Sequence, residues 1–442
     1  MIISLYGKVK RPTAFDVMVF PLIIQGVLTA SLPYFDLILL SGVGAEEVSS
    51  VAISGAILMV LMSVQFGFAQ TVIALKSSDD SENVRSFFVA LSIATLVSTL
   101  MALWLWINIA TITELFVKNL LYVDLVSSYL RWLVISLPIT QITLCCGFFL
   151  RSYGKTKVTL QGFLIEVPTN IIISYFLIYS VSIGIEGAAI GSLLARLVRL
   201  VWMVFHTRVH IKGIKKTRSV SISSRSYLKQ ILSLFGTSFY CSVAVSAASL
   251  YLYSYLSILP PETFAGYSII MTVQGMSLTV LNAVTSIISV MAKMDTNTEP
   301  VVTVESYYQE MLSYLKVCLL FFTFISCISV YASGIVLDFT LVSIFVIVSL
   351  DLVFKSFSAY FSISYLRVFN FHKEAVKCEV VGRCITQMSL IFLLAMLRVE
   401  NIILCVLSVL VAEVITFSLL RRVFQNKKAH SLDNDQSVNS SM

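Results

Sequence analysis

Long apolar runs, separated by short polar segments, occupy almost the whole chain. A helix of about 20 apolar residues crosses the hydrocarbon core of a bilayer, and twelve runs approach or exceed that length. They cover residues 17–41, 51–75, 86–107, 125–150, 158–180, 185–205, 231–259, 264–291, 311–332, 341–366, 380–397 and 402–420. The pattern predicts an all-α polytopic membrane protein with twelve transmembrane helices.

Basic residues gather in particular segments between these runs. The N-terminal end, the midpoint segment 207–229 and the C-terminal end are all basic, and six runs separate each from the next. An even number of crossings puts all three on one side, and cytoplasmic loops are enriched in Lys and Arg. We therefore expect both termini to be cytoplasmic in a multi-pass protein of the cell inner (plasma) membrane. We assign the basic residues of the second half to the same face: Arg367, Lys373, Lys377 and Arg383.

The midpoint segment divides the chain into two halves of six runs that echo each other at an offset of 216 residues. The matching pairs are Leu150-Arg151 with Leu366-Arg367, Glu46 with Glu262, and Ile53 with Ile269. Six helices per half insert in the same orientation, which predicts two lobes related by a parallel repeat. We expect a lobe at 1–206, a basic cytoplasmic linker at 207–229, a lobe at 230–424 and a disordered cytoplasmic tail at 425–442.

The composition argues against an ordinary cytosolic enzyme, a nucleic-acid-binding protein and a disordered protein. Hydrophobic residues make up 57% of the chain and charged residues only 12%, whereas soluble domains carry about 25% charged residues. The net charge of +7 follows from topology, so we expect no nucleic-acid partner. Gly154-Lys155 lacks the earlier glycine of a phosphate-binding loop, because Phe149 occupies that position. We expect no enzyme activity, no cofactor and no metal; energy would come from an ion gradient or a partner, or would not be needed.

Asp36 is the first candidate functional residue, because a charge inside the bilayer costs about 2.5–3.5 kcal/mol on insertion scales. It lies in the outer half of the first run, three residues after Pro33, which is expected to loosen the helix there. The functional interpretation is a carboxylate that binds a proton or another cation. The alternative is a structural carboxylate that pairs with a basic residue or caps a broken helix.

The fifth run carries a second candidate pair. Glu166 and Asn170 are four residues apart and share one helical face, with Pro168 between them to distort the helix. They would form half of a polar site, although a helix-packing hydrogen bond would explain them equally well. Arg196 and Arg199 lie near the inner end of the sixth run, where we expect both side chains to reach the interface.

The second half offers a further polar site. Asp351 and Lys355 are spaced i, i+4 and are expected to neutralise each other. Glu413 in the last run is the remaining candidate, with an inter-helix hydrogen bond as its equally supported alternative.

Four motifs resemble those of the multidrug and toxic compound extrusion (MATE) transporters. They are Phe35-Asp36 through Ser41-Gly42-Val43-Gly44, the loop Leu150-Arg151-Ser152-Tyr153-Gly154-Lys155-Thr156, Asn170 through Leu177-Ile178, and Gly184-Ile185-Glu186-Gly187-Ala188-Ala189. The resemblance implies a two-lobed, twelve-helix antiporter that exports amphipathic or cationic compounds in exchange for protons or sodium.

The family's functional residues carry over unevenly. Asp36 matches the first-span aspartate tied to cation coupling, and Asn170 matches the asparagine beside it. Ser174 stands where the family has an aspartate, and Glu166 is a candidate substitute. Asp351 lies on the span where the sodium-using branch has an aspartate, whereas that branch's acid on the seventh span is absent.

We therefore expect a secondary exporter that works by alternating access, with the lobes rocking about the linker. Its partners would be a small-molecule substrate, a proton or sodium ion and the lipid bilayer. The main alternative is a flippase or exporter for a lipid-linked saccharide or a dedicated secondary metabolite, since fold does not fix function. A membrane scaffold or receptor is the third class; it would tolerate apolar replacements of the intramembrane polar residues.

Overall fold

The computed structural model describes residues 14–74, 80–214, 237–294, 307–335, 338–366, 371–399 and 401–439. This part of the chain is helical and contains no strand. The elements are α1 (Ala14–Ser41), α2 (Ala45–Ala74), α3 (Asp80–Ile107), α4 (Ile109–Phe116), α5 (Leu120–Ser152), α6 (Thr156–Tyr175), η2 (Phe176–Ser180), α7 (Gly184–Gly213), α9 (Thr237–Leu256), α10 (Pro261–Met294), α12 (Tyr308–Ala332), α13 (Phe339–Ala359), η3 (Tyr360–Leu366), α14 (His372–Glu379), η4 (Val380–Thr386), α15 (Gln387–Met396) and α16 (Ile402–Asn439).

Each predicted apolar run coincides with helix, which confirms the all-α polytopic fold class. Eleven segments of the described chain are long and apolar enough to cross a membrane. The seventh predicted span is represented by α9, a helix rich in Ser and Tyr that is not one of those eleven. Residues 231–236 of that span lie outside the described residues.

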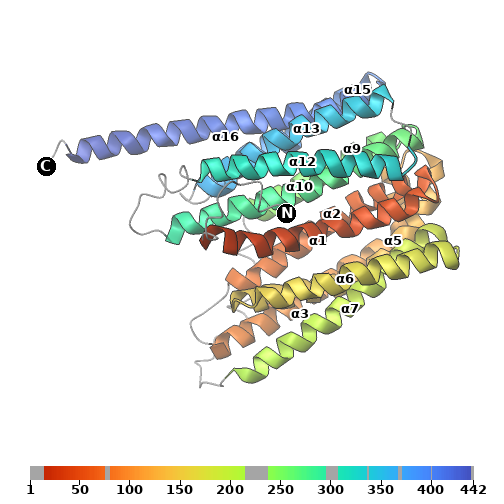
Figure 1. The fold of residues 1–442 in the computed structure, drawn as a ribbon, viewed down its shortest axis with the longest axis horizontal. Helices are drawn as coiled ribbons and strands as arrows, with labels where there is room; N and C mark the ends of the chain where they lie inside the picture. The colour runs from red at the N-terminus through yellow and green to blue at the C-terminus, as the bar shows by residue number, and fades with distance from the viewer. Residues whose placement is uncertain are drawn as a thin grey trace.

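The repeat is visible in where the helices begin. The start of α2 at Ala45 and that of α10 at Pro261 are 216 residues apart, as are the starts of α6 at Thr156 and α14 at His372. The two halves therefore place corresponding helices at the same offset that the sequence identities gave. The long helices run side by side, with the first-half helices α3, α5, α6 and α7 on one side of α1 and α2 and the second-half helices on the other (Figure 1).

The first two helices join the halves. α1 packs against α10 of the second half and against α6 and α7 of its own half, and α2 packs against α9 and α10 as well as α5. Tyr34 of α1 also forms a hydrogen bond with Ser329 of α12, with 2.7 Å between their hydroxyl oxygens. A change in the position of α1 would therefore alter helix packing in both halves.

The boundaries of the linker and tail differ from those predicted. α7 continues to Gly213, into the predicted linker 207–229, and residues 215–229 lie outside the described residues. α16 continues to Asn439, through most of the segment 425–442 for which disorder was predicted, and its end projects beyond the other helices (Figure 1). The helix continues because residues 421–439 contain no Pro or Gly to interrupt it.

The prolines leave their helices continuous. α1 continues through Pro33, and α6 continues through Pro168 as far as Tyr175. The irregular turn of the fifth span comes later, as the π-helical segment η2. Within a membrane, neighbouring helices can provide hydrogen-bond partners for the backbone groups that a proline leaves unpaired.

Two glycines bring α7 close to the fifth span. Gly187 and Gly191 are one turn apart, and small residues at this spacing let transmembrane helices approach closely. A Cβ atom added at Gly191 would lie 2.9 Å from Cα of Ser174, and one added at Gly187 would lie 3.0 Å from the carbonyl carbon of Leu177. The Gly191 contact leaves no room for a Cβ atom unless the helices move apart, and the Gly187 contact is close to that limit.

We predict that Gly191→Ala destabilises the protein by about 1–3 kcal/mol, the usual cost of overpacking a close contact. Gly55→Ala is the matched control, because a Cβ at this α2 position meets nothing within 4 Å. Thermal unfolding in lipid nanodiscs would measure both variants. Equal unfolding temperatures for Gly191→Ala and wild type would contradict the close packing of α6 and α7.

Candidate functional site

Asp36 lies at the centre of a polar cluster formed by four helices of the first half. Its side chain is 3% exposed, and Oδ2 accepts hydrogen bonds from Ser192 Oγ of α7 at 2.8 Å and from the Tyr129 hydroxyl of α5 at 3.2 Å. Asn170 of α6 donates its Nδ2 hydrogen to Ser192 Oγ at 2.7 Å. The predicted residues Asp36 and Asn170 are thus brought together through Ser192, which the sequence did not single out.

The Asp36 carboxylate is held by neutral donors. Its Oδ1 atom and the amide oxygen of Asn170 have no hydrogen-bond partner within the described part of the chain. Arg196, one turn beyond Ser192 on α7, donates to Ser136 Oγ of α5, and Asp36 forms no ion pair among the described residues. The cluster therefore combines a buried carboxylate with oxygen acceptors that a proton or another cation could use.

Glu166 does not belong to this cluster. Its carboxylate forms an ion pair with Arg199 of α7, with 2.8 Å between Oε2 and Nη1. The Arg199 guanidinium also lies over the ring of Phe163, with its carbon 3.5 Å from the ring centroid. The expectation that Arg199 reaches the interface is wrong: its side chain is buried, and its charge is met inside the lobe by a carboxylate and an aromatic face.

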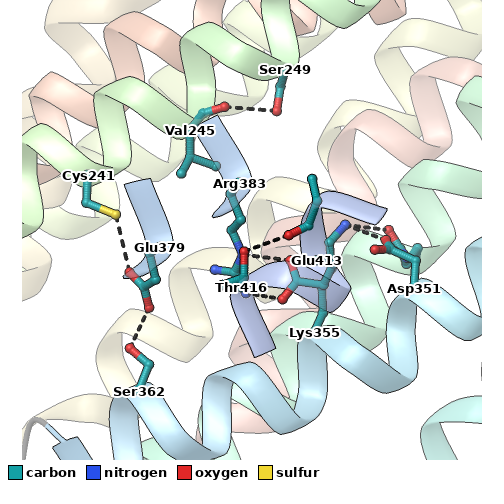
Figure 2. Close-up of polar contacts among 12 residues, drawn as sticks. Cys241, Val245, Ser249, Asp351, Lys355, Ser362, Glu379, Arg383, Glu413 and Thr416 are labelled. Carbon is teal, nitrogen blue, oxygen red and sulfur yellow. Dashed lines mark hydrogen bonds and ion pairs between the residues drawn. The ribbon is translucent and has the colours of Figure 1, made fainter. Parts of the chain in front are cut away.

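The second half contains a larger charged cluster (Figure 2). Lys355 Nζ and Asp351 Oδ2 of α13 form the expected i, i+4 ion pair at 2.7 Å. Gln274 of α10 bridges them, because its Nε2 donates to Asp351 Oδ2 at 2.7 Å and its Oε1 accepts from Lys355 Nζ at 3.3 Å. Sequence reasoning missed Gln274, an amide that lies inside the eighth run.

Glu413 is paired with an arginine that was assigned to the cytoplasmic face. Arg383 of η4 donates from Nε to Glu413 Oε2 at 2.7 Å and from Nη2 to Glu413 Oε1 at 2.9 Å (Figure 2). Parallel bonds of this kind are the strongest geometry for an arginine–carboxylate pair. The basic-face assignment of Arg383 is therefore wrong; its place inside the run 380–397 was the signal available in the sequence.

One turn before Arg383, Glu379 extends the cluster. Its carboxylate accepts hydrogen bonds from Ser362 Oγ of η3 and from Cys241 Sγ of α9, the latter at 3.2 Å (Figure 2). Three acidic and two basic residues of the second half thus lie on four elements: Asp351 and Lys355 on α13, Glu379 on α14, Arg383 on η4 and Glu413 on α16.

A cavity of about 80 Å³ lies beside these ion pairs. Lys355, Arg383 and Glu413 line it together with uncharged residues: Val245, Ser249, Leu252, Tyr253, Tyr267, Met271, Gln387, Val409 and Ala412. Lys355 and Glu413 of the predicted second-half site therefore face one space, while Asp351 is bonded to Lys355.

We predict that Arg199→Met alone destabilises the protein by about 3–5 kcal/mol, because it leaves the Glu166 carboxylate buried without its partner. Combining it with Glu166→Gln should recover most of that loss, since no charge is then stranded. Thermal unfolding of both single variants and the double variant would measure the coupling. Additive losses in the double variant would mean that the two side chains do not interact.

Both the sequence and the fold of this chain were compared with those of known proteins. Residues 21–176 match the MatE family model. No curated protein sequence matches the chain. Solved structures of similar fold include an inward-facing multidrug resistance MATE family transporter of the MOP superfamily, with TM-score 0.71 and 14% identity over 92% of this chain and 99% of that chain.

Two further structures show the same likeness. An outward-facing multidrug resistance MATE family transporter has TM-score 0.66 and 16% identity over 95% of this chain and 96% of that one. A MOP superfamily transporter from Pyrococcus furiosus, described as having a binding pocket of reverse polarity, has TM-score 0.65 and 16% identity over 96% of this chain and 100% of that one. Residues 21–176 thus match the MatE family model, and the chain has the fold of these MATE family transporters.

Proposed function

We propose that the protein is a secondary exporter that moves amphipathic or cationic small molecules by cation-coupled antiport. The observation that carries this proposal is the Asp36 carboxylate, which is buried, held by neutral donors and left with one oxygen unpartnered among the described residues. Such a group can bind a proton or sodium ion and release it when its exposure to solvent changes. Asn170 would support it through Ser192.

The position of Asp36 supports a link between ion binding and movement. It lies on α1, which packs against α6 and α7 of its own half and α10 of the other half. Neutralising the carboxylate would weaken its hydrogen bonds to Ser192 and Tyr129, and so alter how α1 rests on the first lobe. We infer that this change biases the arrangement of the two lobes, since an ion can shift only an equilibrium whose states bind it differently.

Alternating access is the form of movement that we infer. Relatives of this fold are known in inward-facing and outward-facing conformations. The lobes at 1–206 and 230–424 would rock about the linker 207–229, and both termini would be cytoplasmic in the cell inner membrane. Its partners would be the substrate, a proton or sodium ion and the bilayer, with no nucleic acid.

We predict that Asp36→Asn reduces gradient-driven export of ethidium from reconstituted vesicles to the level of protein-free vesicles. Asparagine keeps the size of the side chain but cannot bind and release a proton. Separate proton and sodium gradients would identify the ion. Asp124→Asn is the matched control, because Asp124 is an exposed residue of α5 outside the cluster; normal export by Asp36→Asn would refute the central assignment.

A flippase for a lipid-linked saccharide is the second candidate, and the second-half cavity is the observation that favours it. Lys355 and Arg383 both line this cavity, and cations suit the phosphate groups of such lipids. One relative of this fold is described as having a pocket of reverse polarity that suggests a different function.

Vesicles that contain a fluorescent polyprenyl-diphosphate disaccharide would separate the two candidates. A flippase would move this lipid between leaflets at least tenfold faster than empty vesicles do, and would leave ethidium in place. We expect the opposite result: gradient-driven movement of ethidium with the lipid crossing at the background rate.

A further inference from the structure

The cavity beside the second-half ion pairs presents hydrogen-bond donors whose acidic partners are already occupied. Both oxygens of Glu413 accept from Arg383. Lys355 uses two of its three ammonium hydrogens on Asp351 and Gln274, and Arg383 keeps guanidinium hydrogens beyond the two it gives to Glu413. The cationic groups that line the cavity therefore retain donor capacity that Glu413, its one acidic lining residue, does not use.

Tyr267 provides an independent indication of a ligand. Its side chain is 0% exposed and lines the cavity. Its hydroxyl has no hydrogen-bond partner among the residues that the structure describes. A buried hydroxyl without a partner costs about 1–3 kcal/mol, and an oxygen acceptor bound in the cavity would remove that cost.

The remaining walls are suited to an apolar body. Leu252, Tyr253, Met271 and Val409 line the same space. The volume of about 80 Å³ is well below the roughly 300–1,000 Å³ of pockets that enclose a whole drug-sized ligand. The cavity is therefore sized for the polar end group of a larger amphipathic molecule.

We propose that this cavity binds the oxyanion end of an amphipathic anion, a carboxylate or a phosphate monoester, through Lys355, Arg383 and Tyr267. The ligand's oxygens would accept the remaining hydrogens of the two cations and the hydrogen of the Tyr267 hydroxyl, while the carbons next to the oxyanion contact the aromatic and aliphatic wall. As a ligand contact, the site rests on the proposed export function and adds amphipathic anions to the compounds that the exporter would accept.

Four probes with one apolar body test the site: 4-phenylbutyrate, 4-phenylbutyl phosphate, 4-phenylbutanamide and 4-phenylbutyltrimethylammonium. Calorimetric titration of the full-length protein in nanodiscs, corrected with empty nanodiscs, would give each dissociation constant. We expect at least one oxyanion probe to bind tenfold or more tightly than the amide and the cation. The tighter of the two oxyanions identifies the source of the group; equal binding of all four probes, or tightest binding of the cation, overturns the proposal.

Variants then place the binding in this cavity. Tyr267→Phe should weaken the oxyanion probe about fivefold to tenfold, the effect of one hydrogen bond. The paired change Lys355→Met with Asp351→Asn should weaken it at least tenfold without leaving a buried charge. Tyr122→Phe is the matched control, since Tyr122 is also 0% exposed but lies on α5, outside the cavity.

Unchanged oxyanion binding by Tyr267→Phe and by the paired variant would also overturn the proposal. Because no ion gradient is applied, these titrations are independent of the Asp36→Asn export assay. If the wild-type protein does not prefer the oxyanion probes, only the cavity assignment is refuted. If Asp36→Asn exports normally, only the coupling assignment is refuted.

Discussion

The cost of placing charge in hydrocarbon governs the interior of this protein. A charged side chain inside a membrane-spanning helix cannot reach water, so it must be paired with an opposite charge or with several hydrogen-bond partners. Glu166 meets Arg199, Asp351 meets Lys355, and Glu413 meets Arg383. Asp36 is the contrasting case: within the described residues its carboxylate is held by hydroxyl groups and forms no ion pair. Among these four acids, Asp36 alone lacks an ion pair within the described residues, which is why the coupling proposal centres on it.

Both halves pair a buried acid with an arginine on a neighbouring helix, but the acid and the arginine exchange places between the halves. In the first half, an ion pair ties the fifth span to the sixth, with the acid on α6 and the arginine on α7. In the second half the pair ties η4 to α16, with the arginine on η4 and the acid on α16. Close glycine contacts join the same helix pairs, since Gly191 faces Ser174 and Gly382 faces Thr416. The repeat thus preserves the helix contacts while the charge chemistry of each lobe differs.

The 216-residue offset makes this divergence concrete. Asp36 corresponds to Leu252, which has no charge and lines the second-half cavity. Lys355 corresponds to Ile139, and Arg383 to Val167. Neither polar cluster therefore has a counterpart at equivalent positions. One lobe holds the Asp36 carboxylate among hydroxyl groups, and in the other Lys355, Arg383 and Glu413 line a small cavity.

Apolar run length and the placement of basic segments predicted the helices, their number and the repeat, because a bilayer imposes both requirements on the sequence directly. The i, i+4 pair of Asp351 and Lys355 was also predictable, since its geometry depends on one helix alone. Other contacts could not be obtained in this way: Ser192 between Asp36 and Asn170, Arg199 against Glu166, and Arg383 against Glu413 each join residues on different helices. The sequence by itself determined which apolar runs form helices and that Asp36, Glu166, Asp351 and Glu413 lie within them. Only the tertiary structure decided their partners, because the rotation and packing of neighbouring helices set which side chains meet.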